Sequence, residues 1–174
     1  MDIANNNGSD SVQEVLDRFQ SIRLVNRPSP VHRLSKLEKE IGTQVEIYVK
    51  RDDLLRPLCG NKIRYLEFIL GNYRLSNADC IVHAGGLTSN YLTQLAIVGA
   101  TEQIPVHLIV RAEEPDILQG NLLLSEVFGA KIYYIPETSG LTNKELKEEL
   151  ACELKSQGRT PYVIDYPLSN YHSY

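Results

Sequence analysis

The chain has 174 residues, of which 43% are hydrophobic and 23% are charged, proportions that are ordinary for a globular protein with a sizeable buried core. A formal net charge of −4, with no basic block, removes the usual electrostatic basis of nucleic-acid binding. No apolar run approaches the roughly 20 residues that a membrane-spanning helix requires, so we expect no membrane partner.

The chain begins with the polar, acidic stretch MDIANNNGSDS, which predicts a mobile tail over residues 1–20 rather than a signal peptide. The three cysteines, Cys59, Cys80 and Cys152, are odd in number and far apart. They indicate reduced thiols and a cytoplasmic protein, because disulfide frameworks belong to oxidising compartments. The four histidines are scattered without metal-ligand spacing, so we expect no metal site.

Residues 21–77 carry few secondary-structure signals before their final helix. The pattern SKLE at Ser35–Glu38 is a capping box and predicts a short helix. Val45, Ile47 and Val49 stand at alternate positions and predict a half-buried strand. One strand and one short helix cannot close a core, so we interpret this segment as the N-terminal part of a larger domain.

The stretch CGNKIRYLEF predicts the start of that final helix. Gly60 and Asn61 are turn and cap residues, and apolar residues then recur at helical spacing. Lys62 falls in the first turn, although the partial positive charge of a helix N-terminus disfavours a cation there. One interpretation is a solvated surface lysine. The other is an amine that reacts as a nucleophile with an aldehyde.

Between residues 78 and 166, four short apolar runs alternate with amphipathic helices. The runs are DCIVHAGG, VHLIVR, KIYYIP and YVIDY. The helical signals are a stripe of Leu92, Leu95, Ala96 and Gly99, the helix DILQGNLLLSEVFGA with Gly129 after its end, and a Thr142–Glu145 capping box with a stop at Gly158. This alternation predicts an α/β fold, an open parallel four-stranded sheet with helices on both faces, as a small domain over 78–166.

In an open parallel sheet, ligands bind beyond the carboxyl ends of the strands. The loop HAGGLTSNY follows the first apolar run, and Gly85 and Gly86 allow close approach of the backbone to a ligand. Thr88, Ser89 and Asn90 either cap the next helix or hold an anion beside its free N–H groups. The stretch GGLTSN lacks the G-x-G-x-x-G pattern, so no dinucleotide site is predicted.

The stretches VEIYVKRDDL, CGNKIRYLEF, HAGGLTSN and GNLLLSEVFGA occur in this order and resemble the D-cysteine desulfhydrase and 1-aminocyclopropane-1-carboxylate deaminase family. The resemblance runs from Ser21 to Asp165. Members of this family are pyridoxal-phosphate enzymes with the tryptophan-synthase-β-like fold. The resemblance therefore implies pyridoxal 5′-phosphate as the cofactor, a small amino acid as the substrate, and a 2-oxo acid and ammonia as products.

The resemblance also implies roles for individual residues. Lys62 would form the Schiff base with the cofactor and later move a proton. Asn61 would help to set the cofactor ring, and Asn90 would hydrogen-bond its phenolic oxygen. Ser89 and the neighbouring backbone N–H groups would hold the substrate carboxylate. The substrate-binding residues implied in this way are Thr88, Ser89, Asn90 and Tyr91.

Three positions depart from the motifs of the family. The family usually has Gly-Gly-Asn-Lys, but Cys59 replaces the first glycine, and its Cβ would crowd the cofactor or change the loop. The family often carries a second lysine three residues after the first, and Tyr65 stands there without its positive charge. Tyr91 follows the Ser-Asn pair, where the family has His or Gln.

Members of the family are much longer than this chain, so we expect an N-terminal half that ends in a truncated tail over 167–174. The glycine-rich phosphate cradle lies in the other half, and we therefore expect weak cofactor binding by this chain alone. The alternatives are a catalytically inactive fragment that binds a partner, or one subunit of a split enzyme. Apolar surface left uncovered would also favour a homo-oligomer.

Overall fold

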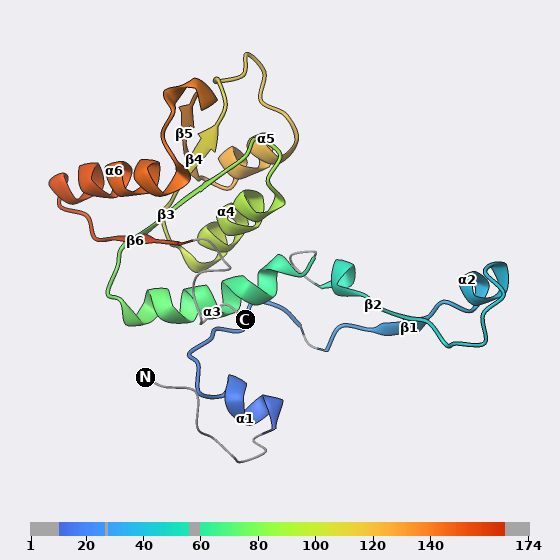
Figure 1. The fold of residues 1–174 in the computed structure, drawn as a ribbon. Coiled ribbons are helices and arrows are strands. Elements are labelled where there is room, and N and C mark those ends of the chain that lie inside the picture. The colour runs from blue at the N-terminus through green and yellow to red at the C-terminus, as the bar shows by residue number, and fades with distance from the viewer. Residues whose placement is uncertain (1–10, 27, 56–59, 166–174) are drawn as a thin grey trace.

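The computed structural model describes residues 11–26, 28–55 and 60–165 (Figure 1). Its centre is a four-stranded sheet with the order β5-β4-β3-β6, in which every neighbouring pair is parallel. The strands are β3 (Cys80–Gly85), β4 (Val106–Arg111), β5 (Lys131–Ile135) and β6 (Pro161–Val163). The predicted parallel sheet is therefore confirmed. Cys59 and the tail predicted over 167–174 lie outside the described residues.

Helices cover both faces of this sheet, because alternate residues of a strand point to opposite faces. The helices are α3 (Lys62–Leu75), α4 (Asn90–Glu102), α5 (Gly120–Val127) and α6 (Asn143–Ser156), with the 3₁₀ turn η2 (Glu137–Ser139) before α6. On one face, Ile81 and Leu108 pack with buried residues of α3, α4 and α5. On the other face, Val82 and Ile109 pack against Leu150 of α6. The predicted helices on both faces are confirmed.

The predicted helix ends agree with the structure in α6 and at the end of α5. Thr142 and Glu145 form the reciprocal capping box at the start of α6. Gly129 and Gly158 follow α5 and α6 with φ of +80° and +82°, the left-handed backbone that ends a helix. The predicted start of α5 is wrong by about a turn. Gln119 has an extended backbone, so residues 116–119 form a loop and the helix begins at Gly120.

An N-terminal segment lies along α3. The short helix α1 (Val12–Leu16) precedes it, within the residues predicted to be a tail. The backbone N–H of Ile22 donates to the Glu67 carbonyl at 2.9 Å, and that of Leu24 donates to Glu67 Oε1 at 3.0 Å. The buried Glu67 side chain therefore serves as a backbone-like acceptor for a segment that forms no sheet of its own.

Residues 31–50, here called the arm, extend away from the four-stranded sheet (Figure 1). The arm consists of β1 (Val31–Arg33), α2 (Ser35–Glu40) and β2 (Tyr48–Lys50), and the 3₁₀ turn η1 (Asp52–Leu54) follows it. The two strands pair antiparallel, with Val31 opposite Lys50. A two-stranded sheet buries little apolar surface, so polar contacts contribute much of what holds the arm together.

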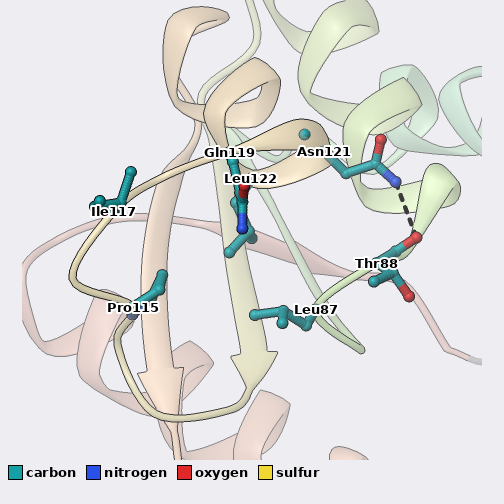
Figure 2. Close-up of a pocket in the computed structure, with 8 residues that line it drawn as sticks. Leu87, Thr88, Pro115, Ile117, Gln119, Asn121 and Leu122 are labelled. Atoms are coloured by element: carbon teal, nitrogen blue, oxygen red, sulfur yellow. Dashed lines mark hydrogen bonds between the residues drawn. The ribbon is translucent and has the colours of Figure 1, made fainter.

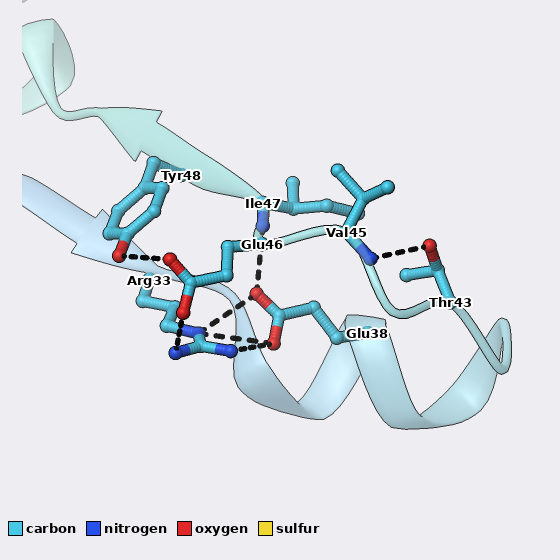
Figure 3. Close-up of polar contacts among 7 residues, drawn as sticks. All are labelled: Arg33, Glu38, Thr43, Val45, Glu46, Ile47 and Tyr48. Carbon is cyan, nitrogen blue, oxygen red and sulfur yellow. Dashed lines mark hydrogen bonds and ion pairs between the residues drawn. The ribbon is translucent and has the colours of Figure 1, made fainter.

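Glu38 is the centre of those contacts (Figure 3). Its carboxylate accepts hydrogen bonds from Arg33 Nε at 3.1 Å and from the backbone N–H of Ile47 at 2.8 Å. The predicted helix is confirmed as α2, but the predicted capping box is wrong, because Glu38 turns to Arg33 and Ser35 is already the first helical residue. Arg33, five residues before Glu38, offers the carboxylate a charged partner, and a charge-assisted hydrogen bond is stronger than a neutral cap.

The predicted half-buried strand is also corrected. The strand is only Tyr48–Lys50, and Val45 lies outside it with 69% of its surface exposed. Alternation of apolar residues predicts a strand when one face has something to pack on. Among the described residues, nothing covers this part of the arm.

The described residues were also compared with the requirements of a membrane span, a metal site and a disulfide. Among the described residues, no helix is long and apolar enough to cross a membrane, and no group of three His, Cys, Asp or Glu side chains is placed to hold a metal ion. The two described cysteines are free thiols. Cys80 is buried in β3, and burial raises the pKa of its thiol to about 11, whereas Cys152 is exposed on α6.

Candidate functional site

The starts of α3, α4 and α5 line one cleft of about 650 Å³. The cleft brings together five of the six residues singled out from the sequence, namely Asn61, Lys62, Ser89, Asn90 and Tyr91. Thr88, the sixth, lines a neighbouring hollow instead. Lys62 and the Ser89–Asn90 pair lie 27 residues apart in the chain, so the shared cleft is a product of the fold.

Lys62 is the first residue of α3, and its side chain is exposed at the cleft. Its Nζ lies 5.4 Å from the centre of the Tyr65 ring, one turn further along the helix. The face of an aromatic ring attracts a cation, and this offsets the unfavourable charge of the helix N-terminus. The ring therefore explains how a lysine is accommodated in the first turn.

Gly60 and Asn61 shape the approach to Lys62. Gly60 has a φ of +94°, a left-handed conformation that favours glycine, and it turns the chain into the helix. Asn61 occupies the N-cap position but makes no side-chain capping hydrogen bond. Its amide is exposed and forms part of the cleft wall, where it is able to contact a bound molecule.

A polar brace holds this end of α3. Arg64 Nε and Nη2 each donate to the Asp52 carboxylate at 2.8 Å, and the Ser29 hydroxyl donates to it at 2.6 Å. The backbone N–H of Gly60 donates to the Asp52 carbonyl at 2.9 Å. The Arg64 guanidinium holds the pKa of Asp52 well below its usual value, with the Ser29 hydrogen bond adding to the effect. The brace fixes where α3 begins, and hence where Lys62 emerges.

Ser89 caps α4, as one of the two interpretations of the loop required. Its hydroxyl oxygen accepts a hydrogen bond from the backbone N–H of Leu92 at 3.3 Å. The hydroxyl proton is still available to a ligand, because a serine both donates and accepts. The first N–H groups of the helix, including those of Asn90 and Tyr91, have no acceptor within the helix. Capping and anion binding are therefore compatible at this position.

Tyr91 contributes to the cleft wall but is mostly buried, with 9% of its surface exposed. Its ring meets the His83 ring edge to face, with centres 5.0 Å apart. Among the described residues, its hydroxyl has no hydrogen-bond partner. Burial raises the pKa of this hydroxyl, so it is a neutral group throughout the physiological range.

Asn121, the second residue of α5, is the site residue that the sequence analysis missed. Its Nδ2 donates to the Thr88 carbonyl at 2.8 Å and to Asn90 Oδ1 at 2.9 Å. The stretch GNLLLSEVFGA drew attention as a helix only. The available signal was topological: α5 follows β4, the neighbour of β3, so the starts of α4 and α5 lie at the same edge of the sheet.

A second hollow, of about 390 Å³, is lined in part by Leu87 and Thr88 of the 86–89 loop (Figure 2). Leu87, Pro115, Ile117 and Leu122 make much of its wall apolar. Asn121 lines both the hollow and the cleft, and its hydrogen bond to Thr88 crosses between the two. The loop between the hollow and the cleft is thus held from the α5 side.

A parallel α/β sheet with a lysine and a Ser-Asn loop beside its carboxyl edge defines a class of site for small anionic ligands. Residues 22–171 match the family of pyridoxal-phosphate dependent enzymes, and the chain belongs to this family. Pyridoxal phosphate is accordingly the cofactor of its relatives, and the recognition made from the motifs is confirmed.

The chain is similar to 1-aminocyclopropane-1-carboxylate deaminases in sequence and to further pyridoxal-phosphate enzymes in structure. The 1-aminocyclopropane-1-carboxylate deaminase of Bradyrhizobium diazoefficiens is 34% identical over 157 residues, which are 86% of this chain and 47% of the relative. The crystal structure of an ACC deaminase homologue is 33% identical with a TM-score of 0.74, covering 86% of this chain and 45% of that chain. A pyridoxal 5′-phosphate-dependent aspartate racemase shares the fold with a TM-score of 0.56 at 20% identity. The chain spans about half the length of the curated relatives that it matches.

The donor set of the cleft fits part of this cofactor. The Lys62 amine, the carboxamides of Asn61 and Asn90, the Ser89 hydroxyl and the N-terminus of α4 are among the groups around this space. These are groups that bind an aldehyde, a ring oxygen and a carboxylate. The fit therefore concerns the reactive end of the cofactor and the substrate carboxylate.

Proposed function

We propose that the protein is a pyridoxal-phosphate-dependent lyase or deaminase that converts a small amino acid to a 2-oxo acid and ammonia, with sulfide as a further product if the substrate is cysteine. The observation that carries the proposal is the convergence of Lys62 with Ser89 and Asn90 on one cleft. The similarity to 1-aminocyclopropane-1-carboxylate deaminases supports the same reaction class.

In this proposal, the cofactor supplies an electron sink for bond cleavage at the substrate. Lys62 Nζ provides the amine that holds the cofactor aldehyde, and it later carries a proton to or from the substrate. The Ser89 hydroxyl and the free N–H groups at the start of α4 bind the substrate carboxylate. Asn90 donates a hydrogen bond to the ring oxygen of the cofactor, and Asn61 orients the ring.

We further propose that the active form contains either a second copy of this chain or another chain that provides the remaining half of the fold. The exposed apolar residues of the arm support this proposal, because uncovered apolar surface favours association.

Chemical trapping tests the role of Lys62. The protein is incubated with pyridoxal phosphate and reduced with borohydride, which makes a lysine–cofactor link permanent, and its peptides are mapped by mass. The expected result is a pyridoxyl group on the peptide that contains Lys62, and its loss in Lys62→Ala.

Lys36→Ala is the matched control, because Lys36 is an exposed lysine in the first turn of another helix, α2, outside the cleft. This control should retain the modified Lys62 peptide. A label that persists in Lys62→Ala, or that falls on other lysines of the unaltered protein, would contradict the proposal. Release of a 2-oxo acid from D-cysteine or 1-aminocyclopropane-1-carboxylate then distinguishes the two candidate substrates.

A further inference from the structure

Asn121 joins the starts of α4 and α5, two of the three helix starts that line the cleft. It is half-buried at the beginning of α5, and its side-chain amide reaches the loop before α4 (Figure 2). The two protons of Nδ2 are both used, one by the Thr88 carbonyl at 2.8 Å and the other by Asn90 Oδ1 at 2.9 Å. Asn121 therefore contacts the residue proposed to bind the cofactor ring without being proposed to touch the cofactor.

The hydrogen-bond chemistry fixes the orientation of both amides. A backbone carbonyl only accepts hydrogen bonds, so the Asn121 side chain must turn its nitrogen, not its oxygen, toward Thr88. The same nitrogen faces Asn90, and the atom that it meets there must be the acceptor Oδ1. The donor Nδ2 of Asn90 is then on the side away from Asn121. The network assigns the amide orientation without any ligand.

Asn121 is itself held in place. Its backbone carbonyl accepts hydrogen bonds from the Thr93 hydroxyl of α4 at 3.2 Å and from the Ser125 hydroxyl of α5 at 2.8 Å. Both hydroxyl side chains belong to buried residues. Because packing and these hydrogen bonds already hold Asn121, its Nδ2 loses little conformational freedom when it donates to Asn90.

We propose that Asn121 is a positioning residue that keeps the N–H group of Asn90 directed into the cleft, ready to donate to an anionic oxygen. This inference rests on the proposed function for the identity of that oxygen, the ring oxygen of the cofactor. The orientation that Asn121 gives to the Asn90 amide depends only on residues of this chain.

Two substitutions separate positioning from mere packing. Asn121→Asp keeps the shape of the side chain but offers only acceptor oxygens, so Asn90 is expected to turn its Nδ2 toward the carboxylate and away from the cleft. Asn121→Ala leaves the Asn90 amide free to rotate. Positioning therefore predicts that Asn121→Asp is the more harmful change, whereas a packing role predicts that the near-isosteric Asn121→Asp is the milder one.

The first measurement uses the protein without cofactor. The side-chain amide protons of Asn90 are followed by ¹⁵N NMR, and their hydrogen exchange should be slower in Asn121→Asp than in the unaltered protein, because they gain a carboxylate acceptor. Asn121→Ala should not slow the exchange. Unchanged Asn90 amide signals in both variants would overturn the inference, whatever the cofactor does.

The second measurement is the dissociation constant for pyridoxal phosphate. Asn121→Asp should weaken binding about tenfold, the equivalent of roughly one hydrogen bond, and Asn121→Ala should weaken it less. In an Asn90→Ala background the difference between the two should disappear. Equal or reversed effects in the two variants would overturn the inference, whereas a protein that never binds the cofactor at Lys62 would refute only the proposed function.

Two controls match these changes. Ser156→Ala removes the same kind of side-chain-to-backbone hydrogen bond, from the Ser156 hydroxyl to the Glu153 carbonyl on α6, so the exchange of the Asn90 protons should stay unaltered. Gln20→Glu introduces the same amide-to-acid change at an exposed side chain elsewhere. If Gln20→Glu weakened cofactor binding as much as Asn121→Asp, the effect would be one of net charge, and the inference would fail.

Discussion

His83 and Lys147 meet at one backbone carbonyl, that of Ile164, just beyond β6. Lys147 Nζ donates to it at 2.6 Å, and His83 Nδ1 lies 3.1 Å away. Both side chains are buried. Burial lowers the pKa of Lys147, and it lowers the pKa of His83 to about 4. A histidine held neutral at a carbonyl acts as a plain hydrogen-bond donor, so protonation has a cost for the fold.

This cost predicts a pH dependence of stability. In the unfolded chain His83 has its ordinary pKa of 6.5, so between pH 6.5 and about 4 the unfolded state binds more protons and stability falls with falling pH. His83→Gln keeps a donor for the Ile164 carbonyl but does not titrate. From pH 7 to pH 5, urea unfolding should show the unaltered protein losing about 2 kcal/mol more than His83→Gln.

Other groups next to His83 also influence its charge, so the pH experiment needs a control histidine. The Tyr91 ring packs on it, and Lys147 and Asp165 act on its charge with opposite signs. His32→Gln, which replaces an exposed histidine of the arm, should lose stability with pH just as the unaltered protein does. Parallel pH curves for His83→Gln and the unaltered protein would show that His83 is not buried neutral.

The N-terminal segment packs closely on helix α3 because Gly71 has no side chain. A Cβ on Gly71 would lie 2.2 Å from the Gln20 carbonyl oxygen, far inside a van der Waals contact. The N-terminal segment therefore approaches the helix backbone directly, and Ile22 and Leu24 bond to Glu67 one turn earlier. Close approach and polar pairing together dock this segment on α3.

Gly71→Ala tests that docking. The added methyl group must displace residues 20–22, and overpacking of this kind costs about 1–3 kcal/mol, partly offset by a gain in helix propensity of roughly 1 kcal/mol. We expect the amide protons of Ile22 and Leu24 to exchange faster in the variant. Asn72→Ala, one residue further along the same helix, should leave their exchange unchanged. Equal protection in Gly71→Ala would mean that the segment is not docked as described.

Most of the four-stranded sheet and of the helices α4 to α6 could be predicted because their signals are local. The four apolar runs, the stripe on α4 and the Thr142–Glu145 capping box each depend on residues within one element, and the structure contains all of them. The arm could not be predicted as well. The Glu38 carboxylate could serve either a helix cap or Arg33 and Ile47, and only the fold decides that it accepts from Arg33 and Ile47.

In the candidate site, too, the residues with local sequence signals were predicted and a residue that depends on the fold was missed. Lys62, Ser89 and Asn90 were predicted from a helix start, a loop and a resemblance to a family, and they line one cleft. Asn121 was missed because an asparagine at a helix start has an ordinary explanation in capping. Its importance lies in a contact with Asn90 across 31 residues of chain, which no local pattern encodes.

The arm leaves apolar side chains uncovered far from the sheet. Ile41 and Val45 have 58% and 69% of their surface exposed, and among the described residues nothing packs over them. Two-stranded sheets are only marginally stable in water, and exposed apolar patches drive association. The occupant that the chain itself provides at high concentration is a second copy of the same arm.

We therefore predict that the protein self-associates through the arm. Light scattering at rising concentration should show an increasing mass, and the double substitution Ile41→Lys with Val45→Lys should suppress the increase by placing like charges on both partners. Val127→Lys is the matched control, since Val127 is 70% exposed on α5 and lies outside the arm. A mass that stays at one chain at every concentration would contradict association, and equal suppression by Val127→Lys would place the contact elsewhere.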